Sequence, residues 1–580
     1  MDLLLGTTLF ASFLGGVVAL LAPCCVSVML SAYFASTFQR RTPVMAVRPS
    51  TASSALANCP IRSWLRIGAV WHQPPSTLER LTPSTLSCRD PGLRETEPGG
   101  GPAHTVCTND AIVDPGTVPP MNGGSHPMYA VTDPATGERI EEIRNATDEE
   151  VRAAIDRVHR GYSSWRARPV TERAKIALRA ADLFAERADE LAAIMTLEMG
   201  KRINEGRGEV GVVVDIFQYY GNNGPALLAD EPLAIKGGEA VITKGPIGAL
   251  IGIMPWNFPC YQVARFVAPN LVLGNTILLK HASICPRSAA AIEQILHDAG
   301  VPEDVYLNVY ASSAQIPWML ADPRIQGVSL TGSEQAGISV AAEAGKNLKK
   351  SVLELGGSDP LIVLDTVDMD ETVKITATAR MRNCGQSCNA PKRMIVLADI
   401  YDDFVERLTK HVAEYYLPGD PADPATKLPP LASVAAADEV AAQVETAVRQ
   451  GATLRTGGHR IDGPGAYLEA TVLTDVTPEM VAYAEEIFGP VVLVFRAETE
   501  DEAIAIANDT PFGLGASVFG TDRDRARRVA EQIEAGMVYL NSSGGSQADL
   551  PFGGIKRSGI GRELGPLGIE EFMNKKAIRL

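Results

Sequence analysis

Cysteine is scarce in this chain, and its scarcity excludes two classes of protein. The 580 residues contain nine cysteines, at positions 24, 25, 59, 88, 107, 260, 285, 384 and 388. Nine is too few for a disulfide scaffold at this length, and the spacing lacks the paired pattern of a zinc site. We therefore predict no metal site, and a reducing compartment for the part beyond residue 128.

An excess of basic residues is also absent. Lys and Arg together number 53 against 69 Asp and Glu, which gives a formal net charge of −16. Nucleic-acid binding needs a clustered basic surface, so we expect no nucleic-acid partner. This balance is ordinary for a soluble cytoplasmic enzyme.

Charge is missing altogether from residues 3–34, a run long enough to span a bilayer. No Lys or Arg precedes the run, whereas Arg40 and Arg41 follow it, so the rest of a membrane-anchored chain would face the cytoplasm. Within residues 9–36, the stretch GVVALLAPCCVSVML resembles the first membrane span of the cytochrome c biogenesis transmembrane family. That resemblance implies thiol-redox chemistry at Cys24 and Cys25; the alternative is an apolar leader with an incidental cysteine pair.

Regular periodicity is absent from residues 43–127, which are rich in Pro, Ser, Thr, Gly and Arg. Such a segment cannot bury a core, and we predict a disordered linker or a non-native extension. We treat residues 1–42 as a separate apolar segment.

From Met128 onward the sequence is patterned. Thr147 and Glu150 form a capping box before a helix, and a second helix is expected from 171 to 199, with Gly200 as its end. Short apolar runs alternate with segments of helical periodicity. The runs predict strands at 247–254, 276–280, 305–309, 325–330 and 360–365. This alternation predicts an α/β fold with a mainly parallel sheet covered on both faces, and ligands beyond the carboxyl ends of the strands.

Distinctive motifs follow three of these predicted strands: PWNFP, HAS and TGSEQAG. In the last of them, Gly332 and Gly337 bracket the start of a helix. A glycine turn that leads into a helix N-terminus can bind phosphate, because free N–H groups and the helix dipole face the anion. Taken alone, the motif also fits a plain strand-to-helix turn.

Seven motifs occur in order, PWNFP, LLKHAS, TGSEQAG, LELGG, NCGQSC, EEIFGP and PFGGIKRSGIGRELG. Together they resemble the aldehyde dehydrogenase superfamily from about residue 128 to the end, with the bacterial succinate-semialdehyde dehydrogenases most similar. The resemblance implies a Rossmann-like cofactor domain (128–353), a catalytic α/β domain (354–541) and a C-terminal segment (542–580). It also implies a homodimer or tetramer, joined by a strand arm formed by 228–246 and the C-terminal segment.

The resemblance implies three catalytic residues. Cys388 matches the nucleophile, and a thiol suits this role because it adds to the carbonyl and leaves a thioester that water can hydrolyse. Glu354 matches the general base, and Asn257 matches the amide that stabilises the oxyanion together with the Cys388 N–H. The alternatives are an inert buried cysteine for Cys388 and a turn former for Asn257. A Cys384–Cys388 disulfide is a further alternative, as an oxidation switch.

The same resemblance implies a dinucleotide site. Ser283 stands where relatives that prefer NAD carry a glutamate, and a serine beside Lys280 can bind a 2′-phosphate, so we predict NADP over NAD. Ser333 would meet the pyrophosphate. The full set of predicted cofactor residues is Trp256, Lys280, Ser283, Gly332, Ser333, Gly337, Glu486 and Phe488.

A carboxylate-bearing aldehyde is the expected substrate. Arg265 and Arg382 match positions that bind the carboxylate of succinate semialdehyde in relatives, and Ser546 would add a hydroxyl. An ion pair on a helix face is the alternative for either arginine, and another small aldehyde such as glutarate semialdehyde is the alternative substrate. A membrane thiol-redox protein, with residues 1–42 as its working part, is the alternative of another class.

Overall fold

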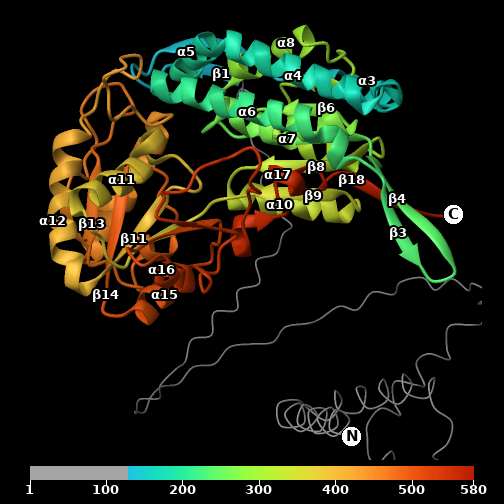
Figure 1. Ribbon diagram of the computed structural model, residues 1–580. Helices are drawn as coiled ribbons and strands as arrows, with labels where there is room; N and C mark the ends of the chain where they lie inside the picture. Colours follow the sequence, from blue (N-terminus) through green and yellow to red (C-terminus); the bar gives the residue numbers. More distant parts are fainter. Residues whose placement is uncertain (1–128) are drawn as a thin grey trace, which may run out of the picture. The chain divides into compact units, whose positions relative to one another are not determined.

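A computed structural model describes residues 129–580 (Figure 1). The predicted membrane segment (1–42) and the predicted linker (43–127) lie outside these residues. Across residues 129–580, no helix combines the length and the apolar character needed to cross a membrane.

The described chain begins with a hairpin and four helices. Thr147 caps the first helix through the predicted capping box: its hydroxyl accepts from the Glu150 N–H, and the Glu150 carboxylate accepts from the Thr147 N–H. The second predicted helix is in fact two helices that meet at Arg187, and Gly200, with φ of 75°, ends the later one as predicted. These elements are β1 (Tyr129–Thr132), β2 (Arg139–Ile143), α3 (Asp148–Ala167), α4 (Val170–Glu186), α5 (Ala188–Met199) and α6 (Ile203–Leu227).

A six-stranded sheet follows, in the order β17-β9-β8-β5-β6-β7. Strands β5 to β9 are parallel, and β17 pairs with β9 in the antiparallel sense. The strands are β5 (Ala249–Ile253), β6 (Thr276–Lys280), β7 (Tyr306–Asn308), β8 (Ile325–Thr331), β9 (Lys350–Glu354) and β17 (Gly559–Ile560). The connecting helices are α7 (Pro259–Leu273), α8 (Pro286–Asp298), α9 (Ile316–Ala321) and α10 (Glu334–Lys346).

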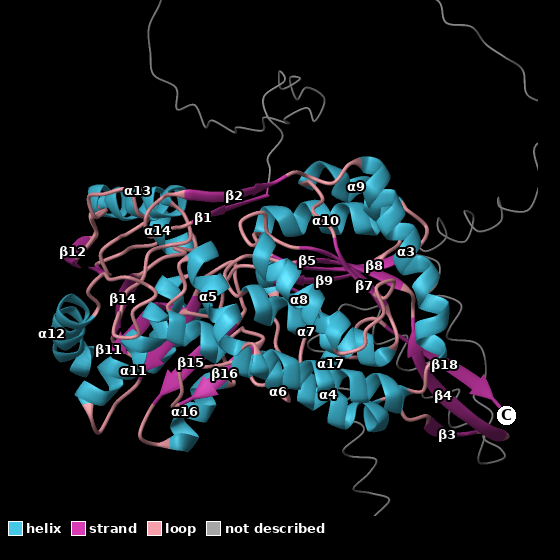
Figure 2. Ribbon diagram, turned by 90° about the horizontal axis from the view of Figure 1, so that it is seen from above, coloured by secondary structure: helices cyan, strands magenta, loops and turns pink. Residues whose placement is uncertain are grey.

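Both faces of this sheet are covered, because its strands are apolar on both sides. Along β6, Ile277 and Leu279 belong to the core formed with α7 and α8, whereas Leu278 belongs to the core formed with α3 and α9. Figure 2 shows α3, α9 and α10 on one side of the sheet and α7 and α8 on the other. The predicted α/β fold with a parallel sheet is confirmed.

A second, seven-stranded sheet has the order β12-β13-β14-β11-β10-β15-β16, parallel except for the β12–β13 pair. Its strands are β10 (Asp359–Val363), β11 (Pro391–Leu397), β12 (Thr453–Thr456), β13 (Thr471–Thr474), β14 (Val491–Ala497), β15 (Gly515–Phe519) and β16 (Met537–Leu540). Its helices are α11 (Met369–Met381), α12 (Ala398–Tyr415), α13 (Val434–Gln450), α14 (Val481–Ala484), α15 (Glu500–Asn508) and α16 (Arg523–Ala530).

A three-stranded sheet forms an arm beside the six-stranded sheet (Figure 1). Its strands are antiparallel and lie in the order β18-β4-β3, so the C-terminal strand pairs with a strand that precedes β5. The strands are β3 (Glu231–Ile235), β4 (Gly238–Pro246) and β18 (Met573–Arg579), and the short helix α17 (Gly565–Gly568) precedes β18.

Candidate active site

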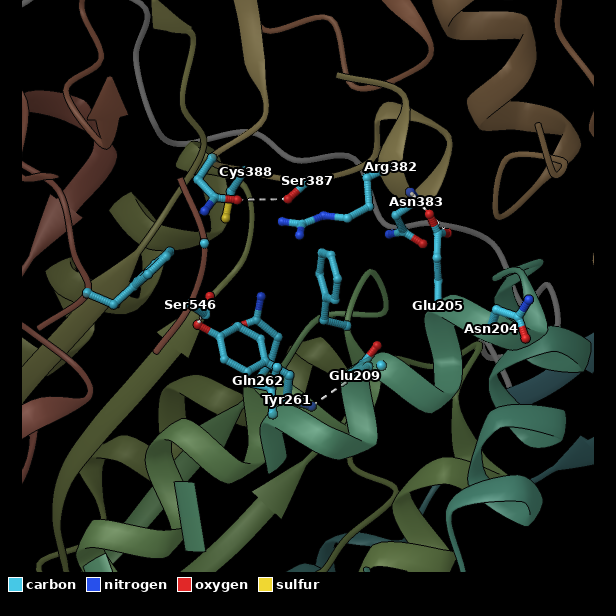
Figure 3. Close-up of a pocket in the computed structure, with 16 residues that line it drawn as sticks. Asn204, Glu205, Glu209, Tyr261, Gln262, Arg382, Asn383, Ser387, Cys388 and Ser546 are labelled. Carbon is cyan, nitrogen blue, oxygen red and sulfur yellow. Dashed lines mark hydrogen bonds between the residues drawn. The ribbon is translucent and has the colours of Figure 1, made fainter. Parts of the chain in front are cut away.

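A cavity of about 380 Å³ lies between α6, the start of α7, the segment before β11 and a loop of the C-terminal segment. Three of the predicted site residues line it, namely Cys388, Arg382 and Ser546. Figure 3 shows their side chains around one space, with the aromatic ring of Tyr261. Phe258 also lines the cavity. The cavity therefore combines a thiol, a cation and an apolar wall.

The thiol stands at the end of an unusual turn. Asn383, Cys384 and Gly385 are three consecutive residues in the left-handed region, with φ of 54°, 55° and 71°. Each non-glycine residue there costs about 1–3 kcal/mol unless its surroundings fix it. The Asn383 amide does so by donating to the Asn257 carbonyl (2.9 Å) and to the Gln386 carbonyl (3.0 Å). At Gly385 only glycine fits, because a Cβ would lie 2.1 Å from the Gly489 oxygen.

Burial raises the pKa of the Cys388 thiol to about 11, although the positive charges of Arg265 and Lys392 act to lower it. The carboxylates of Glu486 and Glu354 act in the same direction as burial. A neutral thiol therefore predominates at pH 7 and must lose its proton before it can attack. Cys384 and Cys388 are both free thiols in the described chain, so the alternative disulfide is not formed here.

Glu354 ends β9 and is almost fully buried, with neither carboxylate oxygen hydrogen-bonded. Burial raises the pKa of this carboxyl well above its usual range, the charge of Glu563 raises it further, and Arg265 opposes the shift. A Cβ on Gly553 would lie 2.7 Å from Glu354 Oε1, so only glycine leaves room for the carboxyl. Such a group holds a proton firmly and, once ionised, is a strong base.

Asn257 lies after β5, where its amide can face the nucleophile turn. Its Nδ2 donates one hydrogen bond, to the Gln386 carbonyl at 3.2 Å. An amide nitrogen carries two N–H groups, so a second one is left to stabilise an oxyanion.

Lys201 and Glu209 form a buried ion pair that sequence reasoning missed. Lys201 Nζ also donates to the Asn257 carbonyl at 2.8 Å. Glu209 accepts from the backbone N–H groups of Cys260 (2.8 Å) and Tyr261 (3.0 Å) at the start of α7. The pair therefore fixes the carbonyl of the predicted oxyanion donor and the backbone three and four residues after it. A signal existed, because Glu209 lies four residues before Val213 and therefore on the same buried face of α6.

The two candidate arginines have different surroundings. Arg265 is buried, does not line the cavity, and pairs with Glu563 at 2.7 Å. Arg382 lines the cavity, and within residues 129–580 its guanidinium has no hydrogen bond or ion pair. Arg265 contacts the cavity wall from behind: it donates to the Tyr261 hydroxyl (3.4 Å), which donates to Ser546 Oγ at 2.6 Å, and it lies 4.4 Å from the centre of the Phe552 ring. The geometry favours Arg382 as the direct ligand of an anion.

The predicted cofactor residues fall into two groups. Ser333 caps α10, accepting from the Ala336 N–H at 3.3 Å, and Gly332 precedes it at the end of β8. Gly337 packs so closely on Leu355 that a Cβ would lie 2.6 Å from that side chain. Lys280 ends β6 at the same carboxyl edge, where burial lowers the pKa of its ammonium, and the exposed Ser283 follows.

The second group lies next to Cys388. The rings of Trp256 and Phe488 meet edge to face, with centroids 5.8 Å apart. Glu486 pairs with Lys392 at 2.8 Å and accepts from the Gly357 N–H at 3.2 Å.

The helix N-terminus at Ser333 and the cation at Lys280 fit an anionic nucleotide, because both present positive charge at one sheet edge. The described residues contain no cluster of His, Cys, Asp or Glu able to hold a metal ion.

A doubly covered parallel sheet beside a cavity that contains a thiol and a cation defines an α/β protein with a candidate nucleophile site. The chain belongs to the aldehyde dehydrogenase family, since the model of that family matches residues 121–578.

Individual relatives agree with this assignment. The chain is 53% identical over 451 residues to the NADP succinate-semialdehyde dehydrogenase of Deinococcus radiodurans, covering 78% of this chain and 94% of the relative. It is 46% identical over 452 residues to succinate-semialdehyde dehydrogenase [NADP(+)] 1 of Mycobacterium tuberculosis, covering 77% of this chain and 99% of the relative. The crystal structure of succinic semialdehyde dehydrogenase from Streptococcus pyogenes with NADP+ is 42% identical, with a TM-score of 0.76, covering 78% and 99% of the two chains.

Proposed function

We propose that this protein oxidises succinate semialdehyde to succinate with NADP as its cofactor. The observation that carries the proposal is the unpaired guanidinium of Arg382 in the cavity that holds the Cys388 thiol. A guanidinium fork binds a carboxylate through two parallel hydrogen bonds and would orient the substrate by the end opposite its aldehyde. The named relatives, which carry this activity in their descriptions, support the assignment.

The reaction begins with the thiol. Cys388 loses its proton to solvent and its sulfur adds to the aldehyde carbon, which gives a thiohemiacetal with the negative charge on its oxygen. Asn257 Nδ2 and the Cys388 N–H donate to the oxygen that carries the negative charge. A bound dinucleotide would supply a nicotinamide ring as the hydride acceptor, and loss of the hydride from the adduct carbon leaves a thioester on Cys388. Glu354 then takes a proton from the water that hydrolyses the Cys388 thioester, and succinate is released.

The dinucleotide would be held by the two groups of residues described above. Lys280 and Ser283 would bind the adenosine end, and Ser283 brings no negative charge against a 2′-phosphate. Gly332, Ser333 and Gly337 would accommodate the pyrophosphate at the start of α10. Trp256, Glu486 and Phe488 would hold the nicotinamide riboside near Cys388.

An aldehyde panel tests this function. Succinate semialdehyde, glutarate semialdehyde and butanal are compared with NADP and NAD, because butanal matches the length of the first but lacks its carboxylate. We expect the highest kcat/KM for succinate semialdehyde with NADP. Replacing Arg382 with glutamine should lower kcat/KM for succinate semialdehyde by roughly 10- to 150-fold, which corresponds to 1.5–3 kcal/mol for a charge-assisted hydrogen bond. Butanal turnover should stay the same; an equal loss for both aldehydes contradicts the assigned role.

Glutarate semialdehyde is the second candidate substrate. Ser546 and Tyr261 line the cavity and bond to each other, and their separation from Arg382 determines which chain length fits. A higher kcat/KM for the longer aldehyde in the same panel would favour this candidate.

The proposal includes the domain division and the assembly. Residues 128–353 form the cofactor-binding part, 354–541 the catalytic part, and the β3–β4 hairpin with β18 the arm that joins subunits. Within the described residues, the two outer strands of this arm, β3 and β18, each leave one edge unpaired, and such an edge can pair with another subunit. The membrane thiol-redox alternative is tested by a chain that begins at Met128: the proposed function requires this chain to oxidise the aldehyde at the rate of the full chain.

A further inference from the structure

Lys392 is a buried cation four residues after Cys388, near the start of β11. Its Nζ donates to the Ser387 carbonyl at 2.8 Å and to the Cys388 carbonyl at 2.6 Å. Its third partner is Glu486 Oε1, at 2.8 Å. Two of these contacts are hydrogen bonds to backbone carbonyls, and the third is an ion pair. Lys392 therefore bonds both to the peptide of the nucleophile and to a predicted cofactor residue.

Glu486 is fixed from the other side by backbone. The Gly357 N–H donates to Oε1 at 3.2 Å, and a Cβ on Gly356 would lie 2.2 Å from Oε2. Two glycines thus let this carboxylate approach the chain after β9. Without Lys392, the carboxylate would keep one backbone hydrogen bond and lose its buried charge partner.

The charges around the thiol come from several elements. Arg265 of α7 and Lys392 of β11 act to lower the pKa of Cys388, whereas Glu486 and Glu354 act to raise it. Asp359 of β10 also faces Lys392; burial raises the pKa of this carboxyl to about 7, and Lys392 opposes the rise. Lys392 and Glu486 are therefore bonded to each other and have opposite effects on one sulfur.

We propose that Lys392 is a positioning residue that joins the cofactor-facing carboxylate of Glu486 to the peptide of the nucleophile. Lys392 sets the orientation of the Glu486 carboxylate and of the Cys388 peptide, and it supplies the cation that donates to the Cys388 carbonyl. This inference rests on the proposed function, because the role of Glu486 toward a dinucleotide comes from it. If the two charges act on the thiol as a pair, removing either one shifts the pKa of Cys388, and the two shifts have opposite signs.

Alkylation of the full chain by iodoacetamide tests the coupling without any turnover. The rate is followed by mass spectrometry at the peptide that contains Cys388, from pH 6 upward. Lys392→Met should raise the pH at half-maximal rate by roughly one unit, the lower end of the effect of a neighbouring charge. Glu486→Gln should lower it. Lys374→Met removes an exposed lysine of α11 and should leave it unchanged.

A titration with NADP adds a second readout. Lys392→Met and Glu486→Gln should both weaken binding, since each releases the same carboxylate or removes its charge. Shifts of the same sign in the two alkylation profiles, or no shift in either, overturn the proposal. Should Lys392→Met fail to fold, the double variant Lys392→Met with Glu486→Gln, which leaves neither charge unpaired, is compared with Glu486→Gln, and its half-maximal alkylation should lie at the higher pH; equal profiles overturn the proposal. If the wild type oxidises no aldehyde but the two variants show opposite shifts, the proposed function alone is refuted. If the wild type oxidises the aldehyde normally but the profiles of the variants do not move, this inference alone is refuted.

Discussion

Replacing Lys201 with methionine removes the positive member of a buried ion pair and leaves its length almost unchanged. The side chains of Lys201 and Glu209 are 0% and 1% exposed, so neither charge is hydrated. Loss of one partner from such a pair destabilises a protein by about 3–5 kcal/mol, because the other charge stays buried and unpaired. Urea unfolding of the full chain should show a loss of this size.

The substitution should also affect the reaction. Lys201 Nζ donates to the carbonyl of Asn257, the predicted oxyanion donor, so its loss removes one of the two hydrogen bonds to this carbonyl and leaves only the one from the Asn383 amide. Removing an oxyanion donor outright lowers kcat by about 10²–10³. Displacing one should lower kcat by at least about 10-fold, with a smaller effect on KM, since the interaction strengthens in the transition state.

Two further variants isolate the pair. Lys201→Met with Glu209→Gln removes both charges and should recover part of the lost stability. Arg207→Met is the matched control on α6, because Arg207 forms an ion pair with Asp189 whose side chains are 45% and 83% exposed. That exposed pair should contribute no more than about 1 kcal/mol. A Lys201→Met protein as stable as the Arg207→Met control, with wild-type kcat, would refute the reasoning.

Three other predictions follow from the same site. Ser283→Glu should lower kcat/KM with NADP by at least about 10-fold through like-charge repulsion of the 2′-phosphate, while kcat/KM with NAD is kept; an unchanged NADP/NAD ratio contradicts this. In Glu354→Gln the rise with pH of the thioester-hydrolysis rate, measured as the steady rate after the first turnover, should disappear, because the raised pKa of this buried carboxyl means that only higher pH ionises the base; wild-type pH dependence of that rate in the variant would exclude Glu354 as the base. Burial lowers the pKa of His281 to about 4 from 6.5, so unfolded chains bind a proton that folded chains reject. Stability should therefore fall as pH drops from 6.5 to 4, by about 3 kcal/mol at most, and His281→Asn should flatten this slope in urea titrations at several pH values.

Much of the fold could be predicted because its signals are local. The apolar strands β5, β6 and β8 are bounded by glycine, proline or polar turns, and Thr147 with Glu150 carries a complete capping signature. The break at Arg187 could not be predicted, because the residues around it include neither glycine nor proline. Tertiary packing, not propensity, ends α4 there.

The site was predictable to a similar degree. The motifs located Cys388, Arg382 and Ser546, which the structure brings to one cavity. The ion pairs of Arg265 and Lys392 were not predictable, since Glu563 and Glu486 lie far away in the sequence and only the folded chain brings the partners together. Arg265 shows the consequence: its position matches a carboxylate ligand, but its partner here is Glu563.

The C-terminal segment serves two places at once. Gly559 of β17 pairs with Glu354, and only fourteen residues later Met573 begins the arm strand β18. The last residue, Leu580, still bonds by its N–H to Glu239 of β4, at 2.9 Å. An affinity tag fused at this end would therefore extend a paired strand of the arm. It would also disturb the short segment between β18 and β17, and β17 pairs with Glu354. For purification, a tag at the opposite end of the chain is the safer choice.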